Sequence, residues 1–123
     1  MERILIIDDD EPFRRMLREA LELVGYEVVE AQDGLDGMKR FKKAAISLVI
    51  TDILMPEKEG LETILDLRKE APEVKIIAVS GGPAKYEYFD VLGLAKNVGA
   101  TRTFKKPFPL HDFLEVVHQL LRG

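Results

Sequence analysis

The sequence predicts an α/β fold in which a doubly wound, five-stranded parallel sheet lies between layers of helices. Short apolar runs alternate with longer segments of helical spacing, a pattern typical of repeated βα units. The length of 123 residues fits one compact domain. The chain is 46% hydrophobic and 33% charged, with 6 prolines and 9 glycines, so it can bury a core. We therefore expect a single domain over residues 1–123, without an output domain.

Five apolar runs are the expected strands: residues 4–7, 27–30, 48–50, 76–79 and 101–105. The first, third and fourth runs are unbroken, which is typical of strands that are buried on both faces. Polar residues interrupt the second and fifth runs, so these strands belong at the edges of the sheet. With right-handed crossovers, the strand order becomes 2-1-3-4-5, a flavodoxin-like (βα)5 arrangement.

A helix is expected after each strand. Pro12 opens the first helix and Gly25 ends it, while the third helix stops before Pro72. Acidic residues that directly precede a helix often cap it, which is our interpretation of Asp10 and Asp33. Apolar residues at helical spacing mark the predicted buried faces: Phe13, Met16, Leu17, Ala20, Leu21 and Val24, then Leu35, Met38 and Phe41, then Leu61, Ile64 and Leu65, then Tyr88, Val91, Leu92 and Ala95, and finally Leu110, Phe113, Leu114, Val117, Leu120 and Leu121.

Charge and composition exclude several classes of function. The chain has 22 acidic and 18 basic residues, a net charge of −4, and no basic stripe of the kind that binds nucleic acid. It has no cysteine, which excludes disulfides and thiolate metal sites. The first apolar run is too short for a signal peptide or a membrane span. We therefore expect a cytoplasmic protein that binds neither nucleic acid nor membrane.

Several polar residues follow the predicted strands. Asp8 and Asp9 follow the first strand, Asp52 the third, Ser80 the fourth and Lys106 the fifth. The carboxyl ends of parallel strands share one edge of a sheet, where ligands bind. Carboxylates about 5 Å apart repel each other by about 3 kcal/mol per pair at an effective dielectric constant near 20, so this cluster needs a cation or a proton. Oxygen ligands without cysteine or histidine favour Mg²⁺.

A metal-bound carboxylate beside a hydroxyl and an ammonium group fits phosphoryl transfer. In this hypothesis Asp52 is the nucleophile and forms an acyl phosphate. The Ser80 hydroxyl and a lysine ammonium bind the phosphoryl oxygens, and the N–H of Gly81 is a further candidate donor.

These motifs resemble the receiver domains of two-component response regulators, of the small single-domain, chemotaxis-regulator type. The resemblance covers the whole chain. It rests on Asp8-Asp9 within Ile-Ile-Asp-Asp-Asp, on Asp52 within Thr-Asp-Ile-Leu-Met-Pro with Gly60 following, on Ser80-Gly81, and on Lys106-Pro107-Phe108.

The resemblance implies roles for individual residues. Asp52 is then the phosphoacceptor, and Asp8, Asp9, Asp52 and the backbone carbonyl of Leu54 form the Mg²⁺ site. The active lysine is Lys106 rather than Lys105, because it directly precedes the proline, and the Lys106-Pro107 peptide bond is expected to be cis. A histidine kinase or a histidine phosphotransfer protein donates the phosphoryl group. The face made by the fourth helix, fifth strand and fifth helix then controls a partner protein.

One position departs from the family pattern. Most members carry an aromatic switch residue three positions before the active lysine, where this chain has Thr103. Phe104 does not replace it, because neighbouring residues in a strand face opposite sides. We therefore expect Ser80 and the fourth helix to carry the response, with Tyr86 and Tyr88 as candidate contributors.

Two other functions are compatible with parts of the sequence. The Asp-x-Asp in Asp8-Asp9-Asp10 also occurs in aspartyl-phosphate phosphatases of the haloacid dehalogenase type, but these normally have Thr or Val where Pro12 stands, and a longer chain. A flavin- or nucleotide-binding domain would need a glycine-rich loop after the first strand, which is missing. A switch that catalyses only its own phosphorylation and dephosphorylation, and is otherwise not an enzyme, is the function predicted here.

Overall fold

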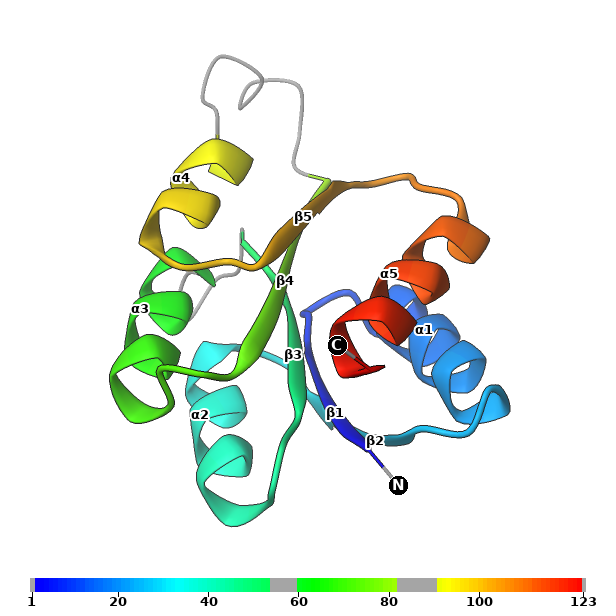
Figure 1. The fold of residues 1–123 in the computed structure, drawn as a ribbon, viewed down its shortest axis with the longest axis horizontal. Helices are drawn as coiled ribbons and strands as arrows, with labels where there is room; N and C mark the ends of the chain where they lie inside the picture. Colours follow the sequence, from blue (N-terminus) through cyan, green and yellow to red (C-terminus); the bar gives the residue numbers. More distant parts are fainter. Residues whose placement is uncertain (1, 54–59, 82–90, 123) are drawn as a thin grey trace.

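The computed structural model describes residues 2–53, 60–81 and 91–122. Its parallel sheet has the order β2-β1-β3-β4-β5 (Figure 1). The strands are β1 (Arg3–Ile7), β2 (Glu27–Ala31), β3 (Leu48–Asp52), β4 (Lys75–Ser80) and β5 (Arg102–Lys105). The helices are α1 (Glu11–Leu23), α2 (Gly34–Lys43), α3 (Gly60–Glu70), α4 (Val91–Val98) and α5 (Leu110–Arg122). The predicted fold class and strand order are confirmed, with β2 and β5 at the edges.

Helices cover both faces of the sheet. In Figure 1, α1 and α5 lie on one side, and α2, α3 and α4 lie on the other. Successive strand residues point to opposite layers, so Ile4 and Ile6 pack with α1 and α5, while Leu5 and Ile7 pack with the other layer. Full burial of each such side chain stabilises the fold by about 1.5–3 kcal/mol. This double burial explains the unbroken apolar runs of the central strands.

Side-chain caps begin the first two helices, as the sequence predicted. The carboxylate of Asp10 accepts a hydrogen bond from the Phe13 N–H at 3.2 Å, and that of Asp33 accepts one from the Asp36 N–H at 2.8 Å. Gly25 has a φ of 102°, a left-handed conformation that favours glycine just beyond a helix end.

Some predicted details are wrong. Helix α1 ends at Leu23, so Val24 is a C-cap residue that is exposed rather than part of the apolar face. Met16 is 42% exposed, because the buried stripe of α1 runs through Leu17 and Leu21. Leu35 and Leu65 are 51% and 45% exposed, because the buried stripes of α2 and α3 run through the preceding residues, Gly34 and Ile64. Strand β5 begins one residue after Thr101. The predicted positions of Tyr86 and Tyr88 lie outside the described residues, and so do the side chains of Val91 and Leu92.

The strand register brings the ends of four strands together. Ile7 of β1 is paired with Thr51 of β3, Asp52 with Val79 of β4, and Ser80 with Lys105 of β5. The residues that follow these strands therefore meet at one edge of the sheet. Within the described ranges, no helix has the length and apolar character needed to cross a membrane.

Candidate metal and phosphoryl site

Three carboxylates gather at this edge of the sheet. Asp8, Asp9 and Asp52 each offer an oxygen atom, and these atoms lie within 4.8 Å of one another. Asp8 directly follows β1, and Asp52 ends the neighbouring strand β3. Asp8 and Asp52 are buried, with exposures of 1% and 7%, whereas Asp9 is exposed. The cluster is therefore closed on its sheet side and open at Asp9.

The cluster is short of positive charge. Burial, reinforced by the negative charge of Asp8, raises the pKa of Asp52 to about 7, against the opposing effects of Lys106 and of the Ile53 N–H. Burial also raises the pKa of Asp8, although Lys106 and the Asp10 N–H both donate to its carboxylate. Among the described residues, the three carboxylates thus share the charge of one ammonium group, which leaves room for a further cation.

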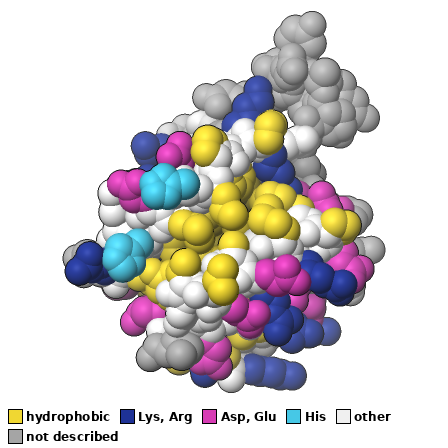
Figure 2. Space-filling view, turned by 90° about the vertical axis from the view of Figure 1, so that its right-hand side faces the viewer, with side chains coloured by type: hydrophobic (Ala, Val, Ile, Leu, Met, Phe, Trp, Pro, Cys, Tyr) yellow, Lys and Arg dark blue, Asp and Glu magenta, His cyan; other side chains and the backbone are white. Residues whose placement is uncertain are grey.

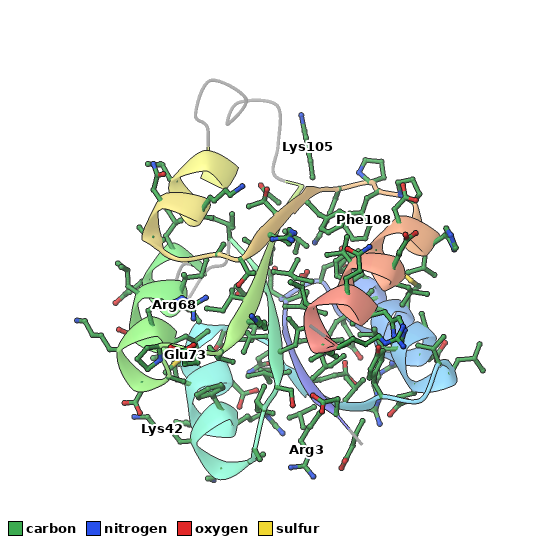
Figure 3. The ribbon with its side chains drawn as sticks, in the orientation of Figure 1. Arg3, Lys42, Arg68, Glu73, Lys105 and Phe108 are labelled. Atoms are coloured by element: carbon green, nitrogen blue, oxygen red, sulfur yellow. The ribbon has the colours of Figure 1, made fainter. Side chains whose placement is uncertain are left out.

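Lys106 supplies that ammonium group. Its Nζ lies 2.9 Å from Oδ2 of Asp8, and its side chain is 18% exposed. The Lys106-Pro107 bond is cis, as the resemblance implied. By contrast, Lys105 is exposed and projects away from the edge of the sheet (Figure 3). The structure therefore places the lysine before the proline, and not its neighbour, at the acidic cluster.

Ser80 and Gly81 approach the site from β4. Ser80 ends this strand and is 7% exposed, and its carbonyl accepts a hydrogen bond from the Lys106 N–H at 2.7 Å. A Cβ atom on Gly81 would lie 2.8 Å from the Cβ of Lys106. The glycine therefore lets the stem of Lys106 pass close to the end of β4.

The close surroundings of Gly60 also require a glycine at this position. A Cβ atom there would collide with the backbone oxygen of Asp52 and lie 2.6 Å from the Cα of Ile53. The Gly60 N–H also donates to the Ile53 carbonyl at 2.8 Å. Helix α3 can thus begin against the backbone of the candidate phosphoacceptor only because this residue has no side chain. Leu54, the remaining predicted metal ligand, lies outside the described residues.

The predicted switch position lies in β5. Thr103 is half-buried and is paired with Ala78 of β4. Phe104 packs on the opposite side, with its ring centroid 5.2 Å from that of Phe108 and 4.9 Å from that of Phe113. Phe104 therefore belongs to the α1 and α5 layer and does not substitute for the missing aromatic residue.

Sequence reasoning missed two residues that contact the site. The Phe13 ring centroid lies 4.0 Å from the Nζ of Lys106, and Arg14 donates to the Asp8 carbonyl at 2.6 Å. Both residues lie in the first turns of α1, directly after the acidic run. The sequence offered one indication of these contacts, which is that both residues closely follow the acidic run. Helical spacing predicted that Phe13 faces the core but not that it contacts Lys106.

The donor set fits Mg²⁺. The three side chains present carboxylate oxygens alone, at a spacing that one ion can bridge, and Mg²⁺ prefers such hard ligands. The raised pKa values of Asp8 and Asp52 show that their ionised forms are under-compensated, so a divalent cation would stabilise them.

Comparison with known proteins identifies the family. The family model described as response regulator receiver domain matches residues 4–118, and the chain belongs to this family. Its members are phosphorylation-activated switches of two-component systems. This finding favours the signalling switch over the aspartyl-phosphate phosphatase that the Asp-x-Asp motif left open.

Individual relatives agree with this assignment. The chain is 34% identical to the response regulator receiver protein CpdR of Brucella abortus, over 98% of each chain. Several other curated relatives are longer, and the chain spans about half their length.

Solved structures are similar over the whole chain. A CheY-like receiver domain from Methanospirillum hungatei has a TM-score of 0.90 and 30% identity, with 99% of this chain and 94% of the other covered. The response regulator TrrA of Thermotoga maritima, in complex with Mg²⁺ and BeF, has a TM-score of 0.84 and 34% identity, with 98% of this chain and 100% of the other covered.

Proposed function

We propose that Asp52 is the phosphoacceptor of this receiver domain and that Asp8, Asp9, Asp52 and the Leu54 carbonyl hold the Mg²⁺ that the reaction requires. The observation that carries this proposal is the cluster of three carboxylates within 4.8 Å, two of them buried, which the ammonium group of Lys106 alone serves among the described residues. Crowded buried carboxylates destabilise a fold, and a neutral side chain in place of one of them would make it more stable. Their occurrence here therefore points to a function rather than to a structural role.

The proposed step is an in-line displacement at phosphorus. A carboxylate oxygen of Asp52 forms a bond to phosphorus while the bond from phosphorus to the donor's leaving atom breaks, and the leaving group takes the electron pair. Bound Mg²⁺ supplies charge neutralisation for the phosphoryl oxygens. The 3.0 Å hydrogen bond from the Ile53 N–H to Oδ1 of Asp52 fixes the orientation of the attacking carboxylate.

Three groups from neighbouring strands bind the phosphoryl oxygens. The hydroxyl of Ser80, the N–H of Gly81 and the ammonium of Lys106 come from the ends of β4 and β5. Each charge-assisted hydrogen bond contributes about 1.5–3 kcal/mol. Two or three of them together reach the roughly 5 kcal/mol that moves a two-state equilibrium from mostly inactive to mostly active.

The domain catalyses only its own phosphorylation and dephosphorylation and turns over no other substrate. Its phosphoryl donor is a histidine kinase or a histidine phosphotransfer protein, and its effector is a partner protein that recognises the face made by α4, β5 and α5. Because Thr103 replaces the usual aromatic residue, Ser80 and α4 carry the response to that face.

Intact-mass measurement tests the proposal. The protein is incubated with acetyl phosphate and Mg²⁺, and we expect a gain of about 80 Da, one phosphoryl group. EDTA and the Asp52→Asn variant should each remove the gain. Asp10→Asn is the matched control, because Asp10 lies in the same acidic run but outside the cluster, and it should be phosphorylated like the wild type. Steady release of phosphate from a generic ester by unmodified protein would instead indicate a phosphatase.

A further inference from the structure

We propose that Phe13 is a positioning residue for Lys106, whose ring keeps the ammonium group beside the acidic cluster when Mg²⁺ occupies Asp8. This inference rests on the proposed function of Lys106 as a phosphoryl-binding group. It assigns a role to a residue that is neither a proposed metal ligand nor a proposed phosphoryl-binding group.

Among the residues that the structure describes, the ammonium group of Lys106 has two partners. One is Oδ2 of Asp8 at 2.9 Å, and the other is the face of the Phe13 ring, with its centroid 4.0 Å away. A cation over an aromatic face at this distance is attracted by the ring quadrupole. The low exposure of the Lys106 side chain, 18%, strengthens this attraction because little water competes for the ammonium.

The two partners differ in what else they can bind. Asp8 is a proposed Mg²⁺ ligand, and Mg²⁺ binds carboxylate oxygens while it keeps the rest of its shell hydrated. A carboxylate that neutralises a divalent cation attracts an ammonium group less strongly. The ring of Phe13 is no ligand for a hard cation, so it remains available to Lys106 in the metal-bound protein. Without it, the flexible stem of Lys106 would leave for solvent.

Neighbouring residues hold the Phe13 ring in place. Its N–H donates to the capping carboxylate of Asp10, and its ring meets that of Phe108 edge to face, with centroids 6.1 Å apart. Phe108 in turn stacks on Phe113 of α5, at 4.8 Å. Figure 3 shows Phe108 on the side of β5 that faces α5. The ring under the ammonium is therefore anchored at both its backbone and its edge.

The same rings line an apolar groove that opens beside the site. It has a volume of about 400 Å³ and is lined by Phe13, Met16, Gly81, Lys106, Pro107, Phe108 and Leu110. Figure 2 shows apolar side chains gathered across this side of the molecule, over α1 and α5. The groove places Lys106 beside a mainly apolar lining, so the ring and the acidic cluster are the favourable neighbours of the ammonium on this side.

Proton NMR of the Lys106 side chain tests the inference. The ε-methylene protons of a lysine over an aromatic face are shifted upfield by the ring current, and Lys106→Gln assigns the signal by removing it. We expect an upfield signal in the wild type, both without metal and at saturating Mg²⁺. Phe13→Leu should move it to the ordinary lysine position, and Phe13→Tyr should restore it. Phe104→Leu is the matched control, since it removes a ring that packs on Phe108 and Phe113 rather than on Phe13, and it should leave the signal upfield.

The rate of phosphorylation by acetyl phosphate at saturating Mg²⁺ is the second readout. Phe13→Leu should slow it about two- to fivefold, the strength of a partly exposed cation–π contact, and Phe13→Tyr should match the wild type. The inference is overturned if the wild type gains the phosphoryl group while its Lys106 signal ignores Phe13→Leu, or if that signal returns to the ordinary position when Mg²⁺ binds. Failure of the wild type to be phosphorylated would refute the proposed function instead.

Discussion

Charged side chains have opposite surroundings at the two ends of the sheet. At the carboxyl edge, Asp8 and Asp52 are buried with too little positive charge around them. At the other end, the guanidinium of Arg68 donates to the carbonyls of Gly99, Pro72 and Val74 at 2.6–3.1 Å and ties α3 to the segments that precede β4 and β5 (Figure 3). The hydrogen-bonded guanidinium stabilises the fold, and the carboxylates that lack compensating charge mark the site.

The pKa shifts express the same contrast. Burial lowers the pKa of the Arg68 guanidinium, with only Glu73 opposing it, yet arginine remains charged at any relevant pH. Burial raises the pKa of Asp52 to about 7, which puts its titration near neutral pH. The charge of Arg68 is therefore fixed and serves stability. A carboxyl group with a pKa near neutrality instead responds to a proton, a metal ion or a phosphoryl group.

The largest expected effect is on stability when the excess charge is removed. The folded-state pKa of Asp52, about 7, exceeds the ordinary value of 3.8, so the folded protein binds the proton more tightly and stability falls as pH rises between these values. The difference corresponds to at most about 4 kcal/mol. In EDTA, Asp52→Asn should therefore be more stable than the wild type by about 2–4 kcal/mol at pH 8 and equal to it near pH 4.

Urea unfolding at both pH values measures this. Asp10→Asn is the control, and it should show no such pH dependence because Asp10 lies outside the cluster. Equal stability of Asp52→Asn and the wild type at pH 8 would mean that the carboxylates are not in conflict.

The satisfied end of the molecule should respond in the opposite direction. Arg68→Met removes five hydrogen bonds, four of them to backbone carbonyls that hold three segments together, so we expect a loss of about 2–3 kcal/mol in the free energy of unfolding. Arg15→Met is the control, since the Arg15 side chain is 64% exposed and pairs with Glu11 in its own helix. The contrast between the two ends fails if both variants unfold at the same urea concentration.

Substitutions of Asp9 and Asp10, which are neighbours in the acidic run after β1, should differ in their effect on Mg²⁺ affinity. Asp9 belongs to the cluster, so Asp9→Asn should weaken Mg²⁺ binding about tenfold or more, since even outer-shell partners of a metal are worth about this much. Asp10→Asn should keep wild-type affinity, because asparagine also caps helices well. Isothermal titration calorimetry compares the two variants, and equal Kd values would remove Asp9 from the site.

The smallest effect is expected at a carboxylate that is already paired. Burial alone would raise the pKa of Glu30, but the hydrogen bonds from Arg18 and Arg14 outweigh it, so the pKa is lowered. Glu30→Gln should cost less than about 1 kcal/mol at pH 7. Because a lowered carboxyl pKa contributes stability that is lost as pH falls, this cost should vanish toward acid pH, the reverse of the Asp52 profile. A cost that grew below pH 5 in urea unfolding would contradict this.

Local patterns made most of the fold predictable from sequence. The central strands could be recognised because residues such as Ile6 and Ile50 are buried on both faces, which leaves no polar position in the run. The caps at Asp10 and Asp33 depend on contacts within three residues, so they could also be predicted. The grouping of Asp8 and Asp52 follows from strand order alone.

Contacts between distant segments were not predictable. Arg68 is bound by carbonyls that lie up to 31 residues away, and no composition or spacing marks such acceptors. The placement of Phe13 under Lys106 joins the first turn of α1 to the end of β5, a pairing visible only once the layers have packed. The helical period gives the direction of a side chain to within about one residue position, which is why Leu35 and Leu65 were placed on the buried face.

The central claim is that the three crowded carboxylates allow one of them, Asp52, to accept a phosphoryl group, and it is tested most directly by locating the modification. Protein treated with acetyl phosphate and Mg²⁺ is reduced with borohydride, which converts an aspartyl phosphate to homoserine, and is then sequenced by tandem mass spectrometry. The account predicts homoserine at position 52 alone. Homoserine at position 8 or 9, or at none of the three, would contradict it.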